Sequence, residues 1–410
     1  MESKSNTRWL QHYLKSLKSC NPMWKDLRKE KICLNKESFN PAVEIGYDTV
    51  YGRFLVASKD ILPGEVIVIE PPILIAPKGE ADPTCLSCLT LLPKTEWPTC
   101  STCGAPRCNP VCDGTHHSTK ECRVLSRFRL QRLQNNIDIV KYINAILSPI
   151  RALILMRKSE MINCIMNELQ SNWDDKKRLS KDIYSEENIN KVFNEKLQMN
   201  ANFKTIQYIV GVFDTNTFEV ELGTNKTARA ILPLLAMTNH SCVPNAQQWF
   251  YGGKFMILTA SSFIPRGAAI TISYTQTLWG NKQRKQHIFA TKSFTCGCQR
   301  CQDVTELGTH YSSVRCRECP VDSTGYFVPP DEIQSPWLCN RCPSSMFSID
   351  VKLLEKAMMM FLTKKQRSDP EGIKENISHA TRMLGGQHNI VVQLKYCFIK
   401  VILDQSDEGN

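Results

Sequence analysis

The sequence predicts an α+β protein in which one β fold is split by an inserted cysteine-rich block and by helices. Three observations lead to this prediction. Short β-branched and aromatic runs, typical of strands, occur both before residue 81 and after residue 204. A block dense in cysteine and turn residues lies between them, followed by an apolar pattern of helical period. Further cysteine clusters and a second helical stretch follow the returning strands.

Length and composition indicate a folded protein with metal sites. At 410 residues, of which 42% are hydrophobic, the chain has material for two or three domains. It has no run of about eighteen apolar residues and its opening MESKSNTRWL is polar, so we expect neither a membrane span nor a secretory signal. Nineteen cysteines without such a signal favour metal ligands over disulfides. The net charge of +11 favours acidic partners only weakly.

Residues 1–40 are expected to form a basic N-terminal helical segment. Five apolar residues recur there at helical spacing among lysines and arginines: Trp9, Leu10, Tyr13, Leu14 and Leu17. The pattern suits a surface helix docked by its apolar stripe, and the alternative is an arm that binds nucleic acid. Residues 41–80 are predicted to form a compact β unit, with the turn LPGE between VYGRFLVASKDI and VIVIEPPILIAP.

Residues 81–123 make up the cysteine-rich block, whose low apolar periodicity means that it needs metal to fold. Its candidate ligands are Cys85, Cys88, Cys100, Cys103, Cys108, Cys112, Cys122 and one of His116 and His117. Eight ligands suffice for two closed tetrahedral zinc sites, one with four thiolates and one with three thiolates and an imidazole. Closed sites of this kind stabilise a fold and leave no position for a reaction.

Helices and then strands are expected after this block. Residues 124–204 carry a helical apolar pattern, in which Pro149 predicts a break. Strand-like runs return in residues 205–292 at TFEVEL, AQQWFYGGKFMILTAS and AAITISYT, with YGG and IPRG as turn signals. Residues 349–410 are again helical in pattern.

Two more cysteine clusters lie between these regions. Residues 306–348 contain two C-x2-C pairs separated by nineteen residues, which predict a self-sufficient zinc ribbon with ligands Cys316, Cys319, Cys339 and Cys342. Residues 293–305 supply only three thiolates, those of Cys296, Cys298 and Cys301.

Cys242, in MTNHSCVPNA, is the candidate for the missing fourth thiolate. The other unassigned cysteines stand alone in helical, apolar or basic stretches: Cys20, Cys33, Cys164 and Cys397. With Cys242 included, fifteen cysteines and one histidine fill four zinc sites.

The order of motifs resembles a known family. NHSCVPN, then ITISY, then CGCQRC, with a cysteine block inserted after a G-R-x-L…D-I-x-x-G-E unit, resembles the SET and MYND domain (SMYD-type) protein lysine methyltransferases. The resemblance covers residues 41–305, and the zinc ribbon followed by helices is similar to an arthropod-type branch. It implies a SET fold split by a MYND zinc finger, with a post-SET zinc site. S-adenosylmethionine (SAM) would lie on one face, and a narrow channel would bring the target lysine from the other.

The resemblance also implies residue roles. The SAM site would include Tyr51, Gly52, Arg53, Asn216, Asn239, His240 and Phe294. Tyr274 would be the catalytic hydroxyl at the channel mouth, and Cys242 would bind the post-SET zinc. The finger would interleave its sites, joining Cys85 and Cys88 to Cys108 and Cys112, and Cys100 and Cys103 to a histidine and Cys122. Family spacing would place that histidine at position 118, which is serine, and we favour His117 over His116.

The chemistry of methyl transfer accounts for such a site. Removing the proton of a lysine at pH 7 costs about 4 to 5 kcal/mol. An apolar channel and a nearby sulfonium cation both favour the neutral amine. Tyr274 and backbone carbonyls would then align that amine.

Two residues depart from the family pattern. Phe54 stands where the cofactor loop usually has its second glycine, and a bulky intrusion of this kind costs about 1 to 3 kcal/mol. Lys292 stands where active members tend to carry a second tyrosine.

Two functions from different classes follow. The first is a SAM-dependent protein-lysine N-methyltransferase acting on histones or other proteins in transcriptional regulation, located in the nucleus, the cytoplasm or both. The second is a weakly active or inactive adaptor whose MYND finger recruits corepressors, such as histone deacetylase complexes, through proline-rich peptides. Trp97 is a candidate docking aromatic, although we favour a packing role for it. Direct DNA binding is not expected, because residues 83–122 hold just Lys94, Arg107 and Lys120 as basic residues. We expect a monomer.

Overall fold

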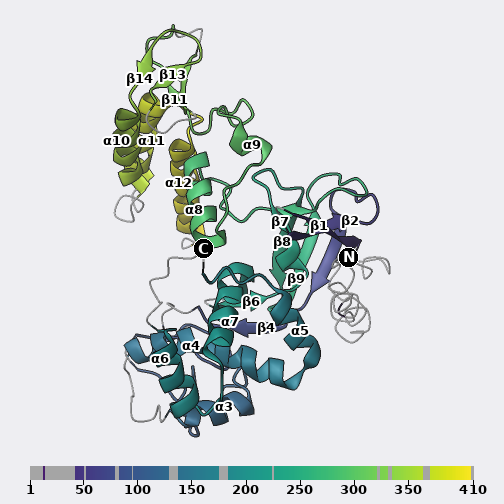
Figure 1. The fold of residues 1–410 in the computed structure, drawn as a ribbon. Coiled ribbons are helices and arrows are strands. Elements are labelled where there is room, and N and C mark those ends of the chain that lie inside the picture. The colour runs from purple at the N-terminus through teal and green to yellow at the C-terminus, as the bar shows by residue number, and fades with distance from the viewer. Residues whose placement is uncertain are drawn as a thin grey trace. The chain divides into compact units, whose positions relative to one another are not determined.

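The computed structural model describes residues 42–49, 52–78, 83–94, 96–128, 137–174, 183–223, 226–320, 324–330, 335–362 and 370–407, together with Tyr13 (Figure 1). The helix expected in residues 1–40 therefore lies outside the described residues, except at Tyr13. The chain divides into two compact units. The first comprises Met1–Asn239 and Pro244–Ile272, and the second comprises His240–Val243 and Ser273–Asn410.

The strands of the first unit form small sheets. In chain order they are β1 (Val43–Asp48), β2 (Gly52–Ala57), β3 (Val66–Glu70), β4 (Leu74–Ala76), β5 (Thr217–Gly223), β6 (Lys226–Ile231), β7 (Asn239–His240, at the unit boundary), β8 (Ala246–Tyr251), β9 (Phe255–Ala260) and β10 (Thr271–Ile272). β1 and β2 form a hairpin. The other sheets run in the orders β3-β9-β8, β4-β6-β5 and β10-β7.

The split β fold is confirmed, because strands from the two sides of the cysteine block pair with each other. β3 pairs with β9, and β4 pairs with β6, although each partner lies far along the chain. β9 is the central strand of its sheet and is buried along its whole length. The cysteine block itself contains no named strand among its described residues, and its loops close by isolated bridges at Thr84–Leu91 and Thr99–Pro106.

The first unit also contains helices, and the longest of them contacts β4 (Figure 1). They are α3 (Thr119–Ser126), α4 (Ile137–Lys158), α5 (Glu160–Glu168), α6 (Glu186–Ile189), the π-helix η4 (Asn190–Lys196), α7 (Phe203–Asn216) and the 3-10 turn η5 (Leu235–Met237). Among the described helices, α4 is the one that is long and apolar enough to cross a membrane. However, 61% of its most apolar window is buried in the unit, as in a core helix.

The break predicted at Pro149 is wrong. α4 runs from Ile137 to Lys158 with Pro149 inside it. A proline in a helix leaves the carbonyl four residues earlier without its usual N–H partner. Here that carbonyl is on Ala145, and the hydroxyl of Tyr184 donates to it at 2.8 Å. A side chain from another segment therefore supplies the hydrogen bond that the proline removes.

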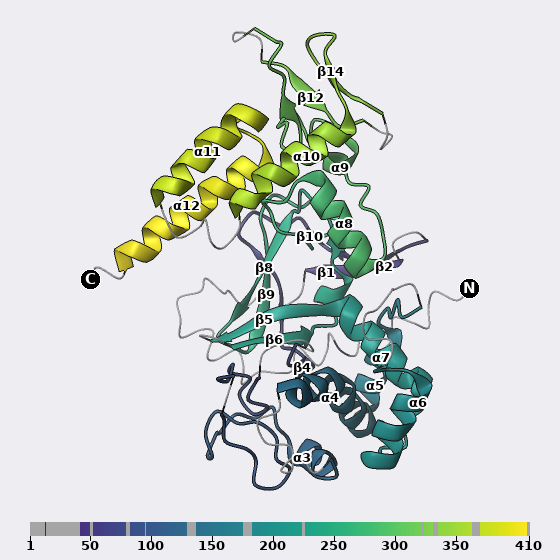
Figure 2. The same ribbon diagram turned by 90° about the vertical axis from the view of Figure 1, so that its left-hand side faces the viewer.

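The second unit joins a small four-stranded sheet to helices (Figure 2). Its elements are α8 (Asn281–Lys292), α9 (Gln299–Gln302), β11 (Val314–Arg315), β12 (Tyr326–Val328), β13 (Trp337–Cys339), β14 (Ser345–Met346), α10 (Ser348–Met359), η6 (Met360–Leu362), α11 (Pro370–Leu384) and α12 (Asn389–Asp407). The sheet and helices share one core, in which Val314 and Phe327 pack with Val351, Leu384 and Val391. The helical pattern expected after residue 349 is confirmed by α10 to α12.

Candidate metal centres and active site

Cysteine and histidine side chains converge in four groups, with the ligand atoms of each group within 4.8 Å of one another. The first group is Cys85, Cys88, Cys108 and Cys112; the second is Cys100, Cys103, His117 and Cys122; the third is Cys242, Cys296, Cys298 and Cys301; the fourth is Cys316, Cys319, Cys339 and Cys342. These are the sets expected from the sequence, and the cysteines are free thiols without disulfides.

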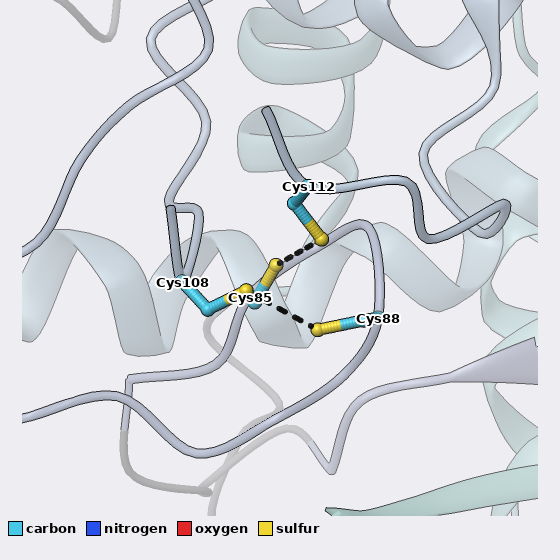
Figure 3. Close-up of side chains that lie close together, drawn as sticks. All are labelled: Cys85, Cys88, Cys108 and Cys112. Carbon is cyan, nitrogen blue, oxygen red and sulfur yellow. Dashed lines mark hydrogen bonds between the residues drawn. The ribbon is translucent and has the colours of Figure 1, made fainter. Parts of the chain in front are cut away.

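The separations of the sulfur atoms suit tetrahedral zinc. With Zn–S bonds of about 2.3 Å, such a site holds its sulfurs about 3.8 Å apart. In the first group the Cys85 and Cys112 sulfurs are 3.8 Å apart, and those of Cys88 and Cys108 are 3.6 Å apart (Figure 3). The fourth group shows the same pairing at 3.7 Å and 3.6 Å. Each group offers four donors, which fits a closed structural site.

Trp97 packs beneath the first group. Its side chain is only 9% exposed and contacts a cluster that includes Cys85, Cys112, Leu92 and Val140 of α4. It therefore serves the core between the cysteine block and α4, and it is not an exposed docking aromatic.

The second group includes His117, and a buried network orients it. The His117 Nδ1 lies 2.8 Å from a carboxylate oxygen of Glu121, which leaves Nε2 directed to the group, 3.4 Å from the Cys103 sulfur. Arg151 of α4 binds the same carboxylate, with 2.6 Å between its Nε and Oε2. Although burial alone would raise the pKa of Glu121, Arg151 and His117 hold it below its usual value. A carboxylate on the far nitrogen is the usual way to orient a metal-bound histidine.

Ser118, which occupies the position of the family histidine, has a structural role. It is the N-cap of α3, and its hydroxyl accepts the backbone N–H of Glu121 at 3.2 Å. Serine is a favoured N-cap residue. The ligand histidine thus precedes the cap, while Glu121 in the first turn of α3 faces it.

Cys242 completes the third group. The segment His240–Val243 clusters with the second unit, although the residues on both sides of it belong to the first. The Cys242 sulfur lies 3.4 Å from that of Cys301 and 4.0 Å from that of Cys296. Phe294 is half-buried and packs against this group.

His240 connects the third group to Tyr274. Its Nε2 lies 3.2 Å from the Cys242 sulfur, and its Nδ1 accepts the backbone N–H of Tyr274 at 2.9 Å. Because Nδ1 accepts, the ring proton belongs on Nε2, where it can be donated to sulfur. The centres of the His240 and Tyr274 rings are 5.3 Å apart. Burial raises the pKa of Tyr274 above its usual value, so the phenol stays neutral at pH 7.

Lys292, the last residue of α8, contacts Tyr274. Its ammonium lies 5.4 Å from the centre of the Tyr274 ring, within the range of a cation–π interaction. Ser293 ends α8 in the left-handed conformation, with a φ of 61°. The lysine that replaces a family tyrosine is therefore directed at the candidate catalytic residue.

Of the cofactor residues expected in the first unit, Gly52 and Arg53 begin β2, and Tyr51 lies outside the described residues. Gly52 has a φ of +70°, and a Cβ there would meet no atom of the described residues within 4 Å. Arg53 instead pairs with Glu168 at the end of α5, at 2.7 Å from its carboxylate. The loop thus has an open glycine beside an arginine that is held by a helix.

Phe54 lies across the β1–β2 hairpin. Its direct partner in the register is Gly46, and a Cβ on Gly46 would stand 2.8 Å from the Phe54 Cζ. A glycine in a strand often marks such a close approach. The phenyl ring is therefore placed over Gly46, while the open side of Gly52 stays clear of it.

Of the two asparagines expected near the cofactor, Asn216 is held by backbone carbonyls. The Asn216 amide, at the end of α7, donates to Gln170 O at 2.7 Å and Val212 O at 2.8 Å. Asn239 is half-buried in β7. The sequence interpretation missed Asn245, whose side chain bonds Thr271 N at 2.8 Å and Ala269 O at 2.9 Å. The second asparagine of NHSCVPN thus connects the motif to the start of β10 and to Ala269 just before it.

Glu70 is a buried carboxylate that the sequence interpretation also missed. It accepts hydrogen bonds from the backbone N–H groups of Leu234 and Leu235 at 2.9 Å and 3.0 Å, and from the Tyr13 hydroxyl at 2.9 Å. It therefore holds the turn η5 that leads into Asn239. Burial raises its pKa to about 7, although the hydrogen bonds oppose that shift.

Comparison with known proteins identifies the family to which the chain belongs. The family model of the SET domain matches residues 52–275, more than half of the chain. The chain belongs to the SET domain family. Its SET domain is interrupted by the cysteine block and the α3–α7 helices, which lie inside the matched range.

Three relatives define its place in that family. Isoform A of the SET domain-containing protein SmydA-8 of Drosophila melanogaster is 31% identical over 326 residues, covering 77% of this chain and 66% of that protein. Isoform B is 30% identical, covering 74% and 67%. Human histone-lysine N-methyltransferase SMYD1 is 31% identical over 111 residues, covering 24% and 23%. The resemblance to the SMYD group is confirmed, and the chain spans about two thirds of the length of its Drosophila relatives.

Proposed function

We propose that this protein is a SAM-dependent protein-lysine N-methyltransferase. The observation that carries the proposal is Tyr274 inside the SET range, a half-buried neutral phenol whose backbone N–H is bound by His240 beside the third group. A relative named as a histone-lysine N-methyltransferase supports the reaction type. We propose histones or other proteins as substrates, and a role in transcriptional regulation in the nucleus, the cytoplasm or both.

The chain's own residues would bind and align the reactants. Gly52, with no described atom within 4 Å of the position of a Cβ, would suit a ligand at the start of β2. SAM supplies the methyl group when it is bound. The Tyr274 hydroxyl can accept or donate a hydrogen bond without ionising, so it can orient a neutral amine. Apolar surroundings also favour the uncharged amine.

Transfer of label from SAM tests the proposal. Purified full-length protein is incubated with methyl-labelled SAM and a mixed protein extract, and labelled lysines are located by mass spectrometry. We expect label on lysine side chains, and a loss of about a hundredfold or more in Tyr274→Phe, as for other positioned catalytic groups. A wild-type protein that binds no SAM and transfers no label would sink the proposal.

The position of Phe54 gives a separate test of the cofactor site. Because its ring lies over Gly46, Phe54→Gly should change the SAM affinity less than about fivefold, or about 1 kcal/mol. Calorimetry on both proteins measures this. A gain near a hundredfold in the variant would instead mean that the ring closes the natural site.

A second candidate is the adaptor, in which the MYND finger recruits corepressors and transfer is weak or absent. The observation that favours it is the Lys292 ammonium on the Tyr274 ring, which places a cation where a substrate amine is expected. Trp97 is buried and does not support peptide docking at that residue. If deleting residues 83–122 left the captured partners unchanged, the adaptor role would be excluded.

A further inference from the structure

Arg284 of α8 is the largest fully buried side chain in the described residues, with 1% exposed. Its guanidinium is directed at the third group. Nε donates to the Cys242 sulfur at 3.2 Å, and Nη2 lies 3.8 Å from the Cys301 sulfur. Nη1 donates to the Trp279 carbonyl at 2.8 Å. An arginine in this place is far from water and has thiol partners.

Glu306 holds the guanidinium from its other side. One of its oxygens lies 2.8 Å from Nη2 of Arg284 and 2.8 Å from Nε of Arg300, and the other accepts from Ser312. Arg284 is charged, because a guanidinium group is not deprotonated in proteins.

The backbone around Glu306 is built to present this carboxylate. Glu306 and Leu307 both have positive φ, 51° and 62°. Each such non-glycine residue costs on the order of 1 kcal/mol and persists only where its surroundings impose it. Asp303 imposes it here, accepting from Thr305 N at 2.8 Å and Leu307 N at 2.9 Å.

Electrostatics explains why a buried arginine belongs here. Four thiolates around one Zn²⁺ carry two net negative charges, and their ligand atoms are largely buried in the third group. An uncompensated buried charge is costly. Arg284 brings one positive charge into contact with two of the sulfurs, while the Glu306 carboxylate is balanced by Arg300. In the described part of the chain, no arginine side chain donates to a sulfur of the other three groups.

The Cys242 sulfur also contacts His240 of the candidate active site. Cys242 lies 3.2 Å from both the Arg284 Nε and the His240 Nε2. His240 in turn accepts the backbone N–H of Tyr274. A continuous chain of contacts, all within the second unit, therefore runs from Glu306 through Arg284, Cys242 and His240 to Tyr274.

We propose that Arg284, held by Glu306, is a positioning residue that compensates the charge of the third zinc site and fixes Cys242, and through it His240 and Tyr274. This inference goes beyond methyl transfer, since it concerns metal retention and the state of His240. Outer-shell partners of metal ligands typically contribute tenfold to a hundredfold in metal affinity.

Zinc release tests the first half of the proposal. The full-length, zinc-loaded protein is mixed with a chromogenic chelator, and the release of its zinc equivalents is followed over time. In Arg284→Met we expect one of the four equivalents to leave at least about tenfold faster than in the wild type, with the others unchanged. Arg284→Lys should be intermediate, because it keeps the charge but not the planar fork. Lys282→Met, an exposed change on the same helix, should match the wild type.

If the Arg284→Met protein folds and releases all of its zinc equivalents at the wild-type rate, the proposal is overturned. If circular dichroism shows that this variant does not fold, Glu306→Gln replaces it. Glu306→Gln should speed the release of the same zinc equivalent by a smaller factor. Release at the wild-type rate from this variant would equally overturn the proposal.

Nitrogen NMR of the histidine rings tests the second half. The His240 signals, assigned with His240→Gln, should show the proton on Nε2 in the wild type and a mixture of tautomers in Arg284→Lys. Unchanged His240 signals in that variant would contradict the positioning role. None of these readouts depends on methyl transfer, so failure of the proposed function would be seen separately.

Discussion

At the scale of single residues, Lys292 has the most direct consequence for activity. If Tyr274 aligns the substrate amine as we propose, the Lys292 ammonium on its ring would compete with that amine and oppose a second cation nearby. We therefore expect Lys292→Met to raise kcat/KM for a protein substrate about tenfold, the equivalent of a contact near 1.4 kcal/mol. Steady-state kinetics measures this, with the exposed Lys282→Met on the same helix as control. A fall in kcat/KM would show that Lys292 assists the reaction.

Glu70 predicts a pH dependence of stability. Its pKa is raised from 4.5 to about 7 in the folded protein, chiefly by burial. The folded state therefore holds the proton more tightly than the unfolded state does. The corresponding stability is fully present below pH 4.5 and is lost as the pH rises to about 7. The total is on the order of 3 kcal/mol.

Urea unfolding of the wild type and Glu70→Gln across this pH range measures the effect. The wild type should lose stability relative to the variant as the pH rises, because glutamine does not ionise. Zinc contributions are common to both proteins and cancel in the difference. Parallel stability curves would contradict the assignment to Glu70.

Residue identities were predictable from the sequence where spacing reports chemistry, as for the sixteen cysteine and histidine ligands that converge in the four groups. Arg151, Arg284 and Glu70 were not predictable. Each is a single charged residue whose role comes from partners distant in sequence: Glu121 for Arg151, Cys242 for Arg284, and Leu234 for Glu70. The one signal was a charge inside an apolar stretch, as for Arg151 in α4.

At the scale of elements, α4 depends on Tyr184. The Tyr184 hydroxyl supplies the Ala145 carbonyl with the hydrogen bond that Pro149 removes. Tyr184→Phe should lower the free energy of unfolding by about 1 to 2 kcal/mol in the natural background. In Pro149→Ala the backbone N–H of residue 149 can bind that carbonyl, so the same change should cost at least about 0.5 kcal/mol less. Denaturant unfolding of the four proteins of this cycle measures the difference, and equal costs in both backgrounds would contradict it.

Strong patterns predicted elements well, and weak ones did not. The hairpin β8–β9 follows from alternating apolar residues around YGG. Of AAITISYT, in contrast, only Thr271–Ile272 is a strand, since the chain then turns toward the third group. α8 was missed because its NKQRKQHIFATK sequence lacks an apolar stripe, and its buried face is made by Arg284 and Ile288.

At the scale of the whole molecule, Cys242 explains why a motif of the SET domain contributes to the second unit. Four residues, His240–Val243, leave the first unit and cluster with residues that follow Ser273. The cysteine count predicts this closure from the sequence, because three thiolates at Cys296, Cys298 and Cys301 need a fourth ligand. The domain boundaries predicted from the sequence, such as 81–123 for the cysteine-rich block, remain predictions.

Native mass spectrometry of the full-length chain tests the central claim, that the third zinc site organises His240 and Tyr274, which we propose to act on SAM and the target lysine. One spectrum counts both bound zinc and bound SAM. We predict four zinc ions and one SAM for the wild type and for Cys164→Ala, an exposed cysteine outside the four groups. Cys242→Ala should retain three zinc ions and take up no SAM. A Cys242→Ala protein that keeps four zinc ions, or that binds SAM with three, would contradict the account.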